Sequence, residues 1–79
     1  MTNHERAITN LKVLITRANC QYGPVTNIYE TMGAIEQEML EVREAIQARN
    51  TVEIRDELFD VANVAIRGAI ALMEGEDNE

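Results

Sequence analysis

The sequence is poor in the residues that support disulfide-rich, thiol-ligated and membrane-spanning structures. Its single cysteine, Cys20, excludes an intramolecular disulfide framework and a zinc site built on several thiols. No apolar stretch reaches membrane-spanning length, and the polar first ten residues, MTNHERAITN, lack the apolar centre of a signal peptide. We therefore expect a cytoplasmic protein without a membrane partner.

Linker-forming and basic residues are also scarce. One proline, four glycines and no low-complexity tract leave no linker, so residues 1–79 are expected to form a single domain. Seven basic side chains against fourteen acidic ones give a net charge of −7. A surface of this sign argues against a nucleic-acid polymer as partner, because nucleic-acid backbones need clustered Lys and Arg, but it is compatible with bound cations.

The hydrophobic pattern predicts an all-α fold with three helices, at about residues 4–20, 28–49 and 52–73. Thr2 and Asn27 each precede a glutamate by three residues, as in a capping box, and mark the first two helix starts. The segment QYGPVTN separates these two helices.

The connection between the second and third helices is very short. Asn50 is predicted as the left-handed residue that ends the second helix, and Thr51 as the cap of the third. So short a connection makes the two helices an antiparallel hairpin. From Phe59 to Met73 only three side chains are polar, and a helix that is apolar nearly all round needs partners on several sides. We therefore expect a homodimer or homotetramer, in which two hairpins form a four-helix core.

Acidic side chains lie beside the apolar faces of both hairpin helices. With about 100° per residue, the expected buried direction of the second helix is defined by Ile35, Met39, Val42 and Ile46. That of the third helix is defined by Ile54, Leu58, Val61, Ala65 and Leu72. Four carboxylates fall inside these arcs or at their borders, namely Glu38, Glu41, Glu57 and Asp60. By contrast, Glu36 and Glu44 face outward.

The hairpin should bring these four carboxylates within roughly one helical turn of a common level. Carboxylates that close repel each other unless a divalent cation lies between them. Mg²⁺ prefers oxygen ligands and keeps waters that substrate phosphates can displace, and Mn²⁺ should also fit. The alternative is a solvated acidic surface, because single E-x-x-E pairs on helices are mostly solvated or paired with basic residues. Two such pairs at one rotational position on adjacent helices favour the metal site.

These residues resemble a known motif. Glu38-x-x-Glu41, followed after fifteen residues by Glu57-x-x-Asp60, is similar to the E-x-x-E … E-x-x-D signature of the MazG-like, all-α nucleoside triphosphate pyrophosphohydrolases. EMLEVREAI resembles the family's EExxELxEAI stretch, and EIRDELFDVANVAIR its ExxDELADVLxxLxR stretch. The resemblance covers residues 35 to about 67. The chain departs from the family in having no obvious fourth helix, no tryptophan and few lysines.

The resemblance implies a Mg²⁺-dependent enzyme that hydrolyses a (deoxy)nucleoside triphosphate to the monophosphate and pyrophosphate. By position, the four carboxylates would be the metal ligands and catalytic residues. Candidate substrate-binding residues are Arg67 for the pyrophosphate, Asn63 for a ribose hydroxyl or a metal-bound water, and Tyr22 or Tyr29 for the base. Each has a structural alternative: an interface ion pair for Arg67, a hydrogen bond to Glu38 for Asn63, and ordinary side-chain contacts for the tyrosines. A non-catalytic acidic helical interaction module, or an acidic metal-binding regulator, is the alternative function.

Overall fold

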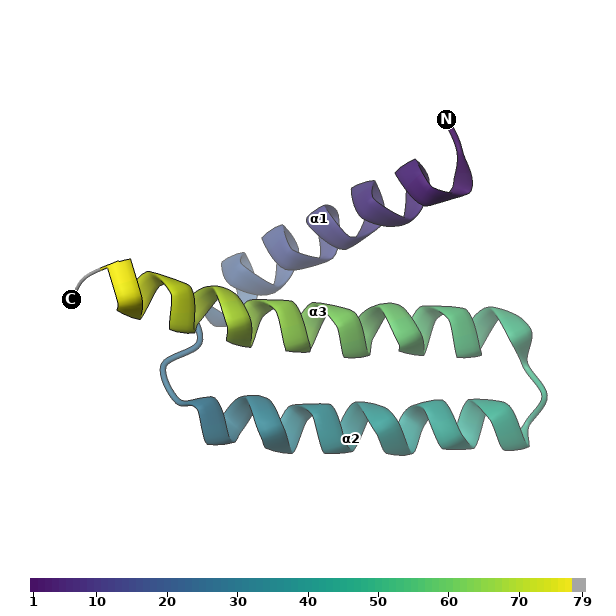
Figure 1. The fold of residues 1–79 in the computed structure, drawn as a ribbon. Helices are drawn as coiled ribbons and strands as arrows, with labels where there is room; N and C mark the ends of the chain where they lie inside the picture. The colour runs from purple at the N-terminus through teal and green to yellow at the C-terminus, as the bar shows by residue number, and fades with distance from the viewer. Residues whose placement is uncertain (78–79) are drawn as a thin grey trace.

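Three α-helices make up the computed structural model, which describes the backbone of residues 1–77 and the side chains of residues 1–75 (Figure 1). They are α1 (Asn3–Tyr22), α2 (Ile28–Gln47) and α3 (Thr51–Asp77). The predicted all-α class is confirmed, and residues 1–77 contain no β-strand. The helix boundaries differ from prediction by up to four residues, because α3 continues past Met73 to Asp77. The last two residues of the GEDNE segment lie outside the described part of the chain.

Local capping chemistry sets the ends of α1 and the start of α2. The Thr2 hydroxyl accepts a hydrogen bond from the Glu5 backbone at 3.1 Å, and the Glu5 carboxylate accepts one from the Thr2 backbone, which completes the predicted capping box. At its other end, α1 stops at Gly23, whose φ of 77° suits glycine. Asn27 caps α2 as predicted, with its Oδ1 accepting from the Tyr29 N–H at 2.9 Å.

The turn after α2 differs from the prediction in its left-handed residue. Arg49, not Asn50, has positive φ, at 55°. Its N–H donates to Ile46 O, and the Asn50 N–H donates to Ala45 O at 3.2 Å, which is the hydrogen-bond pattern of a Schellman motif. A non-glycine residue at this position carries a conformational cost of roughly 1 kcal/mol.

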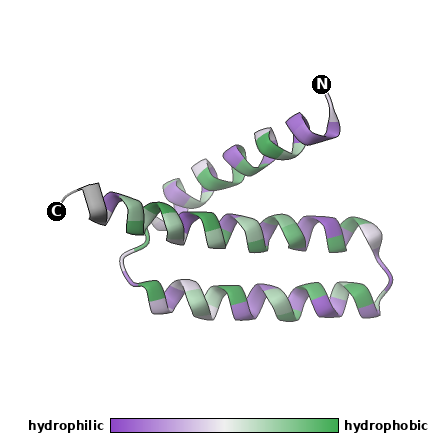
Figure 2. Cartoon of the chain, viewed as in Figure 1, coloured by the Kyte–Doolittle hydropathy of each residue, from purple (hydrophilic) through white to green (hydrophobic). Residues whose placement is uncertain are grey.

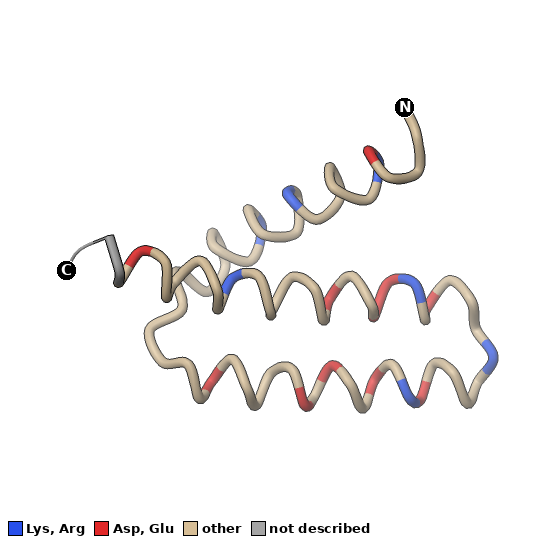
Figure 3. The backbone as a smooth tube through the Cα atoms, in the orientation of Figure 1, with Lys and Arg blue, Asp and Glu red and all other residues tan. Residues whose placement is uncertain are grey.

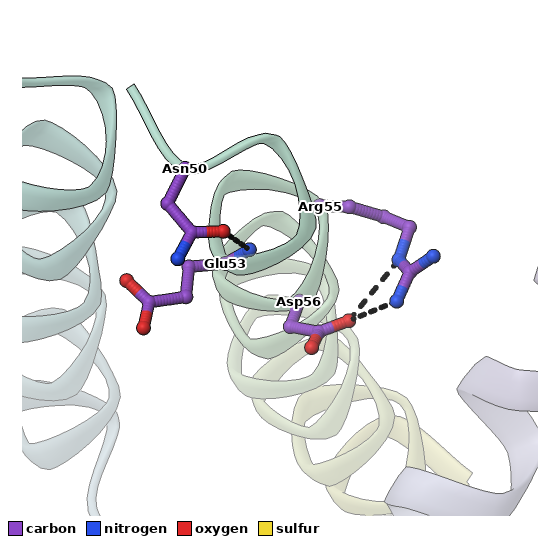
Figure 4. Close-up of polar contacts among 4 residues, drawn as sticks. All are labelled: Asn50, Glu53, Arg55 and Asp56. Carbon is purple, nitrogen blue, oxygen red and sulfur yellow. Dashed lines mark hydrogen bonds and ion pairs between the residues drawn. The ribbon is translucent and has the colours of Figure 1, made fainter. Parts of the chain in front are cut away.

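Asn50 is instead the N-cap of α3, so the prediction of Thr51 as the cap was wrong. The Asn50 Oδ1 accepts from the Glu53 N–H at 3.1 Å, and Thr51 is the first helical residue (Figure 4). An N-cap residue has extended backbone, so one asparagine cannot cap α3 and also be the left-handed residue. In the second turn of α3, Arg55 and Asp56 form an exposed ion pair at 3.1 Å (Figure 4).

The helices α2 and α3 form the predicted antiparallel hairpin, and α1 lies against α3 and diverges from it toward the N-terminus (Figure 1). Thr31 on α2 and Gly68 on α3 approach so closely that a Cβ at Gly68 would lie 2.7 Å from Thr31 Cγ2. The only buried apolar residues described are Ala18, Val42 and Ala45. None of the helices described is both long and apolar enough to cross a membrane.

The single chain buries the expected directions of α2 and α3 only in part, since Val42 is buried but other residues that define them are exposed. Four of the residues that defined them are 51–55% exposed, namely Met39, Ile46, Leu58 and Leu72. The two helices meet instead along the line that carries the small residues and the acids. Small side chains such as Ala45 and Gly68 allow close approach of the backbones, whereas the larger apolar side chains stay at the side. Figure 2 shows hydrophobic residues at intervals along both hairpin helices.

Candidate metal centre

Three acidic side chains converge between α2 and α3. Glu38 and Glu41 come from α2 and Glu57 from α3, and one carboxylate oxygen of each lies within 4.8 Å of the others. The i, i+3 spacing on α2 places its two carboxylates on one side of the helix, and the hairpin register brings Glu57 to their level. Figure 3 shows the acidic residues on both hairpin helices. The sequence predicted this convergence, although Glu57 lies 16 residues after Glu41 and 19 after Glu38 across the turn.

Asp60, the fourth predicted ligand, lies beside this group of three rather than within it. It stands one turn further along α3 and lines a cavity together with Glu38. Its negative charge contributes to the raised pKa of Glu38, and the charge of Glu41 in turn raises the pKa of Asp60. All four carboxylates therefore belong to one electrostatic unit.

The pKa values of the four carboxyl groups reflect their burial and their proximity to one another in the absence of a cation. Burial, with the neighbouring Glu41 as the next cause, raises the pKa of Glu38 from 4.5 to about 7. Burial also raises the pKa of Glu57 and of Asp60. The pKa of Glu41 is lowered, because it accepts hydrogen bonds from the Glu57 and Glu38 side chains. Glu38 and Glu41 therefore titrate as a coupled pair, in which the approach of two carboxyl groups favours protonation of one of them.

Two carboxylate oxygens in the cluster lack any partner. Oε2 of Glu38 and Oε2 of Glu57 are shielded from solvent and accept no hydrogen bond from the residues described. A shielded carboxylate oxygen without a partner costs free energy unless a proton or a cation occupies its lone pairs. The donor set is all oxygen, which fits Mg²⁺ or Mn²⁺.

A cavity of about 570 Å³ opens from Glu38 and Asp60 toward α1. Three of the four candidate substrate-binding residues, Tyr22, Asn63 and Arg67, line it, whereas Tyr29 does not. Its volume lies in the range of small-molecule sites. Glu38 and Asp60 thus adjoin a space of the size that a small-molecule ligand needs.

The cavity wall also contains four polar residues without an assigned role in the sequence prediction, namely Arg17, Gln21, Glu30 and Thr31. The Thr31 Oγ1 and the Asn63 Oδ1 are both shielded from solvent and have no hydrogen-bond partner among the residues described. The spacing of seven residues between Thr31 and Glu38 places them on the same side of α2. The sequence spacing could therefore have indicated that Thr31 lies near Glu38. Arg17 reaches the cavity wall only because of the position of α1, which the sequence spacing does not reveal.

Arg67 joins α1 to α3. Its Nε donates to the Asn19 Oδ1 at 3.0 Å, and its Nη2 donates to the Gly23 carbonyl at 2.7 Å. Both acceptors lie at the C-terminal end of α1, where exposed carbonyls favour a cation. A guanidinium has five N–H donors, so Arg67 can hold α1 in place and still present donors to the cavity.

No known protein family, curated protein or solved structure matches this chain. The functional assignment therefore depends on the carboxylates, the cavity and the motif spacing.

Proposed function

We propose that this chain is a Mg²⁺-dependent nucleoside triphosphate pyrophosphohydrolase, which converts a (deoxy)nucleoside triphosphate and water to the monophosphate and pyrophosphate. The observation that carries the proposal is the convergence of Glu38, Glu41 and Glu57 within 4.8 Å, with two shielded oxygens that lack partners. The motif resemblance described above points to the same chemistry.

Four carboxylates would hold the cation in this proposal, namely Glu38, Glu41, Glu57 and Asp60. When bound, Mg²⁺ or Mn²⁺ neutralises phosphate charge and lowers the pKa of a coordinated water. Water attacks the α-phosphorus, the bond from that phosphorus to the bridging oxygen breaks, and pyrophosphate leaves. Glu38, whose Oε2 is shielded from solvent and lacks a hydrogen-bond partner among the residues described, takes the water's proton in this proposal. Glu41, whose pKa is lowered, remains a charged ligand.

The cavity residues position the substrate in this proposal. Arg67 and Arg17 provide the positive charge that the triphosphate needs, since both line the cavity. Asn63 and Thr31 present unpaired oxygens that can accept hydrogen bonds from sugar hydroxyls. Tyr22 lies at the exposed side of the cavity, where its ring can stack on a base.

A second candidate is a non-catalytic acidic helical interaction module. One observation favours it: the Arg67 guanidinium is already bound to Asn19 and Gly23 within the chain, which leaves fewer free donors for a triphosphate. The same carboxylate cluster would then bind a cation for stability or regulation, without turnover.

A nucleotide panel separates the two candidates. The purified chain is incubated with each canonical NTP and dNTP in Mg²⁺, and pyrophosphate release is measured. We expect release from at least one nucleotide, and a loss of roughly 100-fold or more in Glu41→Gln and Asp60→Asn because each removes a charged ligand. Glu44→Gln is the matched control, since it makes the same charge change at an exposed position on α2 and should keep full activity.

Two results would reject the enzymatic proposal. One is the absence of pyrophosphate release from every nucleotide, together with no rise in Tm when Mg²⁺ and a non-hydrolysable triphosphate are added. The other is activity in Asp60→Asn and Glu41→Gln equal to that of Glu44→Gln. The first result would favour the interaction module. The second would show that Glu41 and Asp60 are not part of the active site.

A further inference from the structure

The guanidinium group of Arg67 has two edges that can each donate a pair of hydrogen bonds. One edge, formed by Nε and Nη2, is used within the chain, because it donates to Asn19 Oδ1 and to the Gly23 carbonyl. The other edge consists of the N–H groups of Nη1 and the second N–H of Nη2. It donates to none of the residues described. Arg67 therefore holds the end of α1 with one edge and keeps a pair of donors on the other.

The free edge belongs to a side chain in the wall of the larger cavity. Arg67 lines the cavity of about 570 Å³ together with Glu38 and Asp60. Asp60 lies seven residues before Arg67 on α3, which places the two on one side of the helix about 10 Å apart along its axis. A ligand with several linked phosphates can therefore extend from a cation at the carboxylates to the free edge of Arg67. Guanidinium edges bind phosphate oxygens in pairs.

The helix α1 forms another part of the same cavity wall, to which it contributes Leu14, Arg17, Ala18 and Gln21. Its attachment to the hairpin is slight, because it lies against α3 and not against α2 and diverges from α3 toward the N-terminus (Figure 1). Ala18 is its only buried residue. Among the residues described, no side-chain hydrogen bonds other than those of Arg67 join the end of α1 to the hairpin. A ligand in the cavity thus contacts both α1 and the residue that holds α1 in place.

We infer that Arg67 couples the binding of a polyphosphate ligand in the cavity to the docking of α1, and that Asn19 is the positioning residue for Arg67. The inference takes its ligand class from the proposed function. Asn19 lines a separate cavity of about 230 Å³ that shares Arg67 with the larger one, so it acts through Arg67. While Asn19 and Gly23 hold one edge of the planar group, the free edge is already oriented when phosphate oxygens arrive. A ligand that prefers docked α1 stabilises the docking by the same factor.

Binding of inorganic tripolyphosphate in the presence of Mg²⁺ tests this coupling, since the probe carries linked phosphates but neither sugar nor base. Calorimetric titration of the full chain gives the Kd. Asn19→Leu keeps a side chain of similar shape without the acceptor and should weaken binding by roughly 10-fold. Asn19→Asp keeps an acceptor oxygen and should stay within about 3-fold of the wild type. Asn10→Leu makes the same change at another exposed position of α1 and is the matched control, which should leave the Kd unchanged.

Two further measurements separate positioning from damage to the fold. The Kd of Mg²⁺ alone should be the same in Asn19→Leu as in the wild type, because Glu38, Glu41 and Glu57 lie on the two hairpin helices. Amide hydrogen exchange should show that tripolyphosphate with Mg²⁺ slows exchange in α1 of the wild type. This slowing should be smaller in Asn19→Leu, because the ligand and the docked helix are then less strongly coupled.

Weaker tripolyphosphate binding in Asn19→Leu, with unchanged Mg²⁺ binding and rescue by Asn19→Asp, supports the inference. This holds even if no nucleotide is hydrolysed, in which case the enzymatic proposal alone fails. Equal Kd values for tripolyphosphate in Asn19→Leu and the wild type overturn the inference, and release of pyrophosphate from a nucleotide would then leave the enzymatic proposal standing. A wild type that does not bind tripolyphosphate also overturns it. So do a parallel loss of Mg²⁺ binding in Asn19→Leu, a failure of Asn19→Asp to restore binding, and exchange in α1 that tripolyphosphate does not slow.

Discussion

Replacing Glu38 by glutamine should stabilise the metal-free protein at alkaline pH. The pKa of Glu38 is raised by burial from 4.5 to about 7, so the folded chain binds this proton more tightly than the unfolded chain. Its contribution to stability is therefore complete below about pH 4.5 and is lost as the pH rises through about 7. Glutamine keeps the shape of a protonated carboxyl group and does not ionise, so the variant escapes this loss.

The magnitude follows from the same pKa difference. One pKa unit corresponds to about 1.4 kcal/mol, so the full difference would amount to about 3 kcal/mol. Glu38 is only partly buried, and solvent screening reduces the expected gain to about 1 to 2 kcal/mol at pH 8. At pH 5 the carboxyl is mostly protonated in the folded chain, so the variant and the wild type should there differ by less than about 0.5 kcal/mol.

Urea unfolding followed by circular dichroism, at pH 5 and pH 8 with a chelator and at one fixed protein concentration, measures both values. Glu44→Gln, with the same substitution at an exposed site on the same helix, should change the free energy of unfolding by less than about 0.5 kcal/mol at either pH. Added Mg²⁺ should stabilise the wild type and stabilise Glu38→Gln much less. A Glu38→Gln variant that is less stable than the wild type at pH 8 would refute the reasoning, because the carboxylate would then be favourable where it lies.

Three further substitutions test how the helices are held. Arg67→Met should lower the free energy of unfolding by about 1 to 3 kcal/mol, because it removes both hydrogen bonds to the end of α1. Amide hydrogen exchange should show that protection is lost in α1 first. An equal loss of protection in all three helices would contradict this role of Arg67. Gly68→Ala should destabilise by about 1 to 3 kcal/mol, since its Cβ would meet Thr31 at 2.7 Å. Gly33→Ala meets nothing within 4 Å and should stabilise α2 by about 1 kcal/mol; equal effects in urea unfolding would disprove the close approach. Arg49→Gly should raise stability by about 0.5 to 1 kcal/mol by relieving the positive φ, whereas Arg49→Ala should give no such gain.

The residues of the candidate site were accessible to sequence reasoning because their arrangement is mostly local. Helical periodicity fixes the relation of Glu38 to Glu41 and of Glu57 to Asp60, and the short turn fixes the register between the two pairs. The same reasoning misplaced the left-handed residue, because Asn50 fits either role in isolation. Only the complete turn shows that its side chain accepts from Glu53 while Arg49 takes the positive φ.

Three features required the tertiary structure. The apolar arcs of α2 and α3 are wide enough for more than one neighbour, so periodicity alone could not tell which side faces the partner helix. The close approach of Thr31 and Gly68 shows which sides of α2 and α3 face each other. The hydrogen bonds of Arg67 to Asn19 and Gly23 depend on where α1 returns against α3, which is a contact between residues 44 to 48 positions apart.

The sequence by itself determined three helices, their caps to within a few residues, and a set of acids at one level of a hairpin. These depend on interactions between residues a few positions apart, which the order of the amino acids specifies directly. Tertiary structure decided that the acids lie between the helices while the large apolar side chains lie at the side, and that α1 closes a cavity over Glu38 and Asp60. Such choices depend on which surfaces fit together across the whole chain, and side-chain size at distant positions settles them.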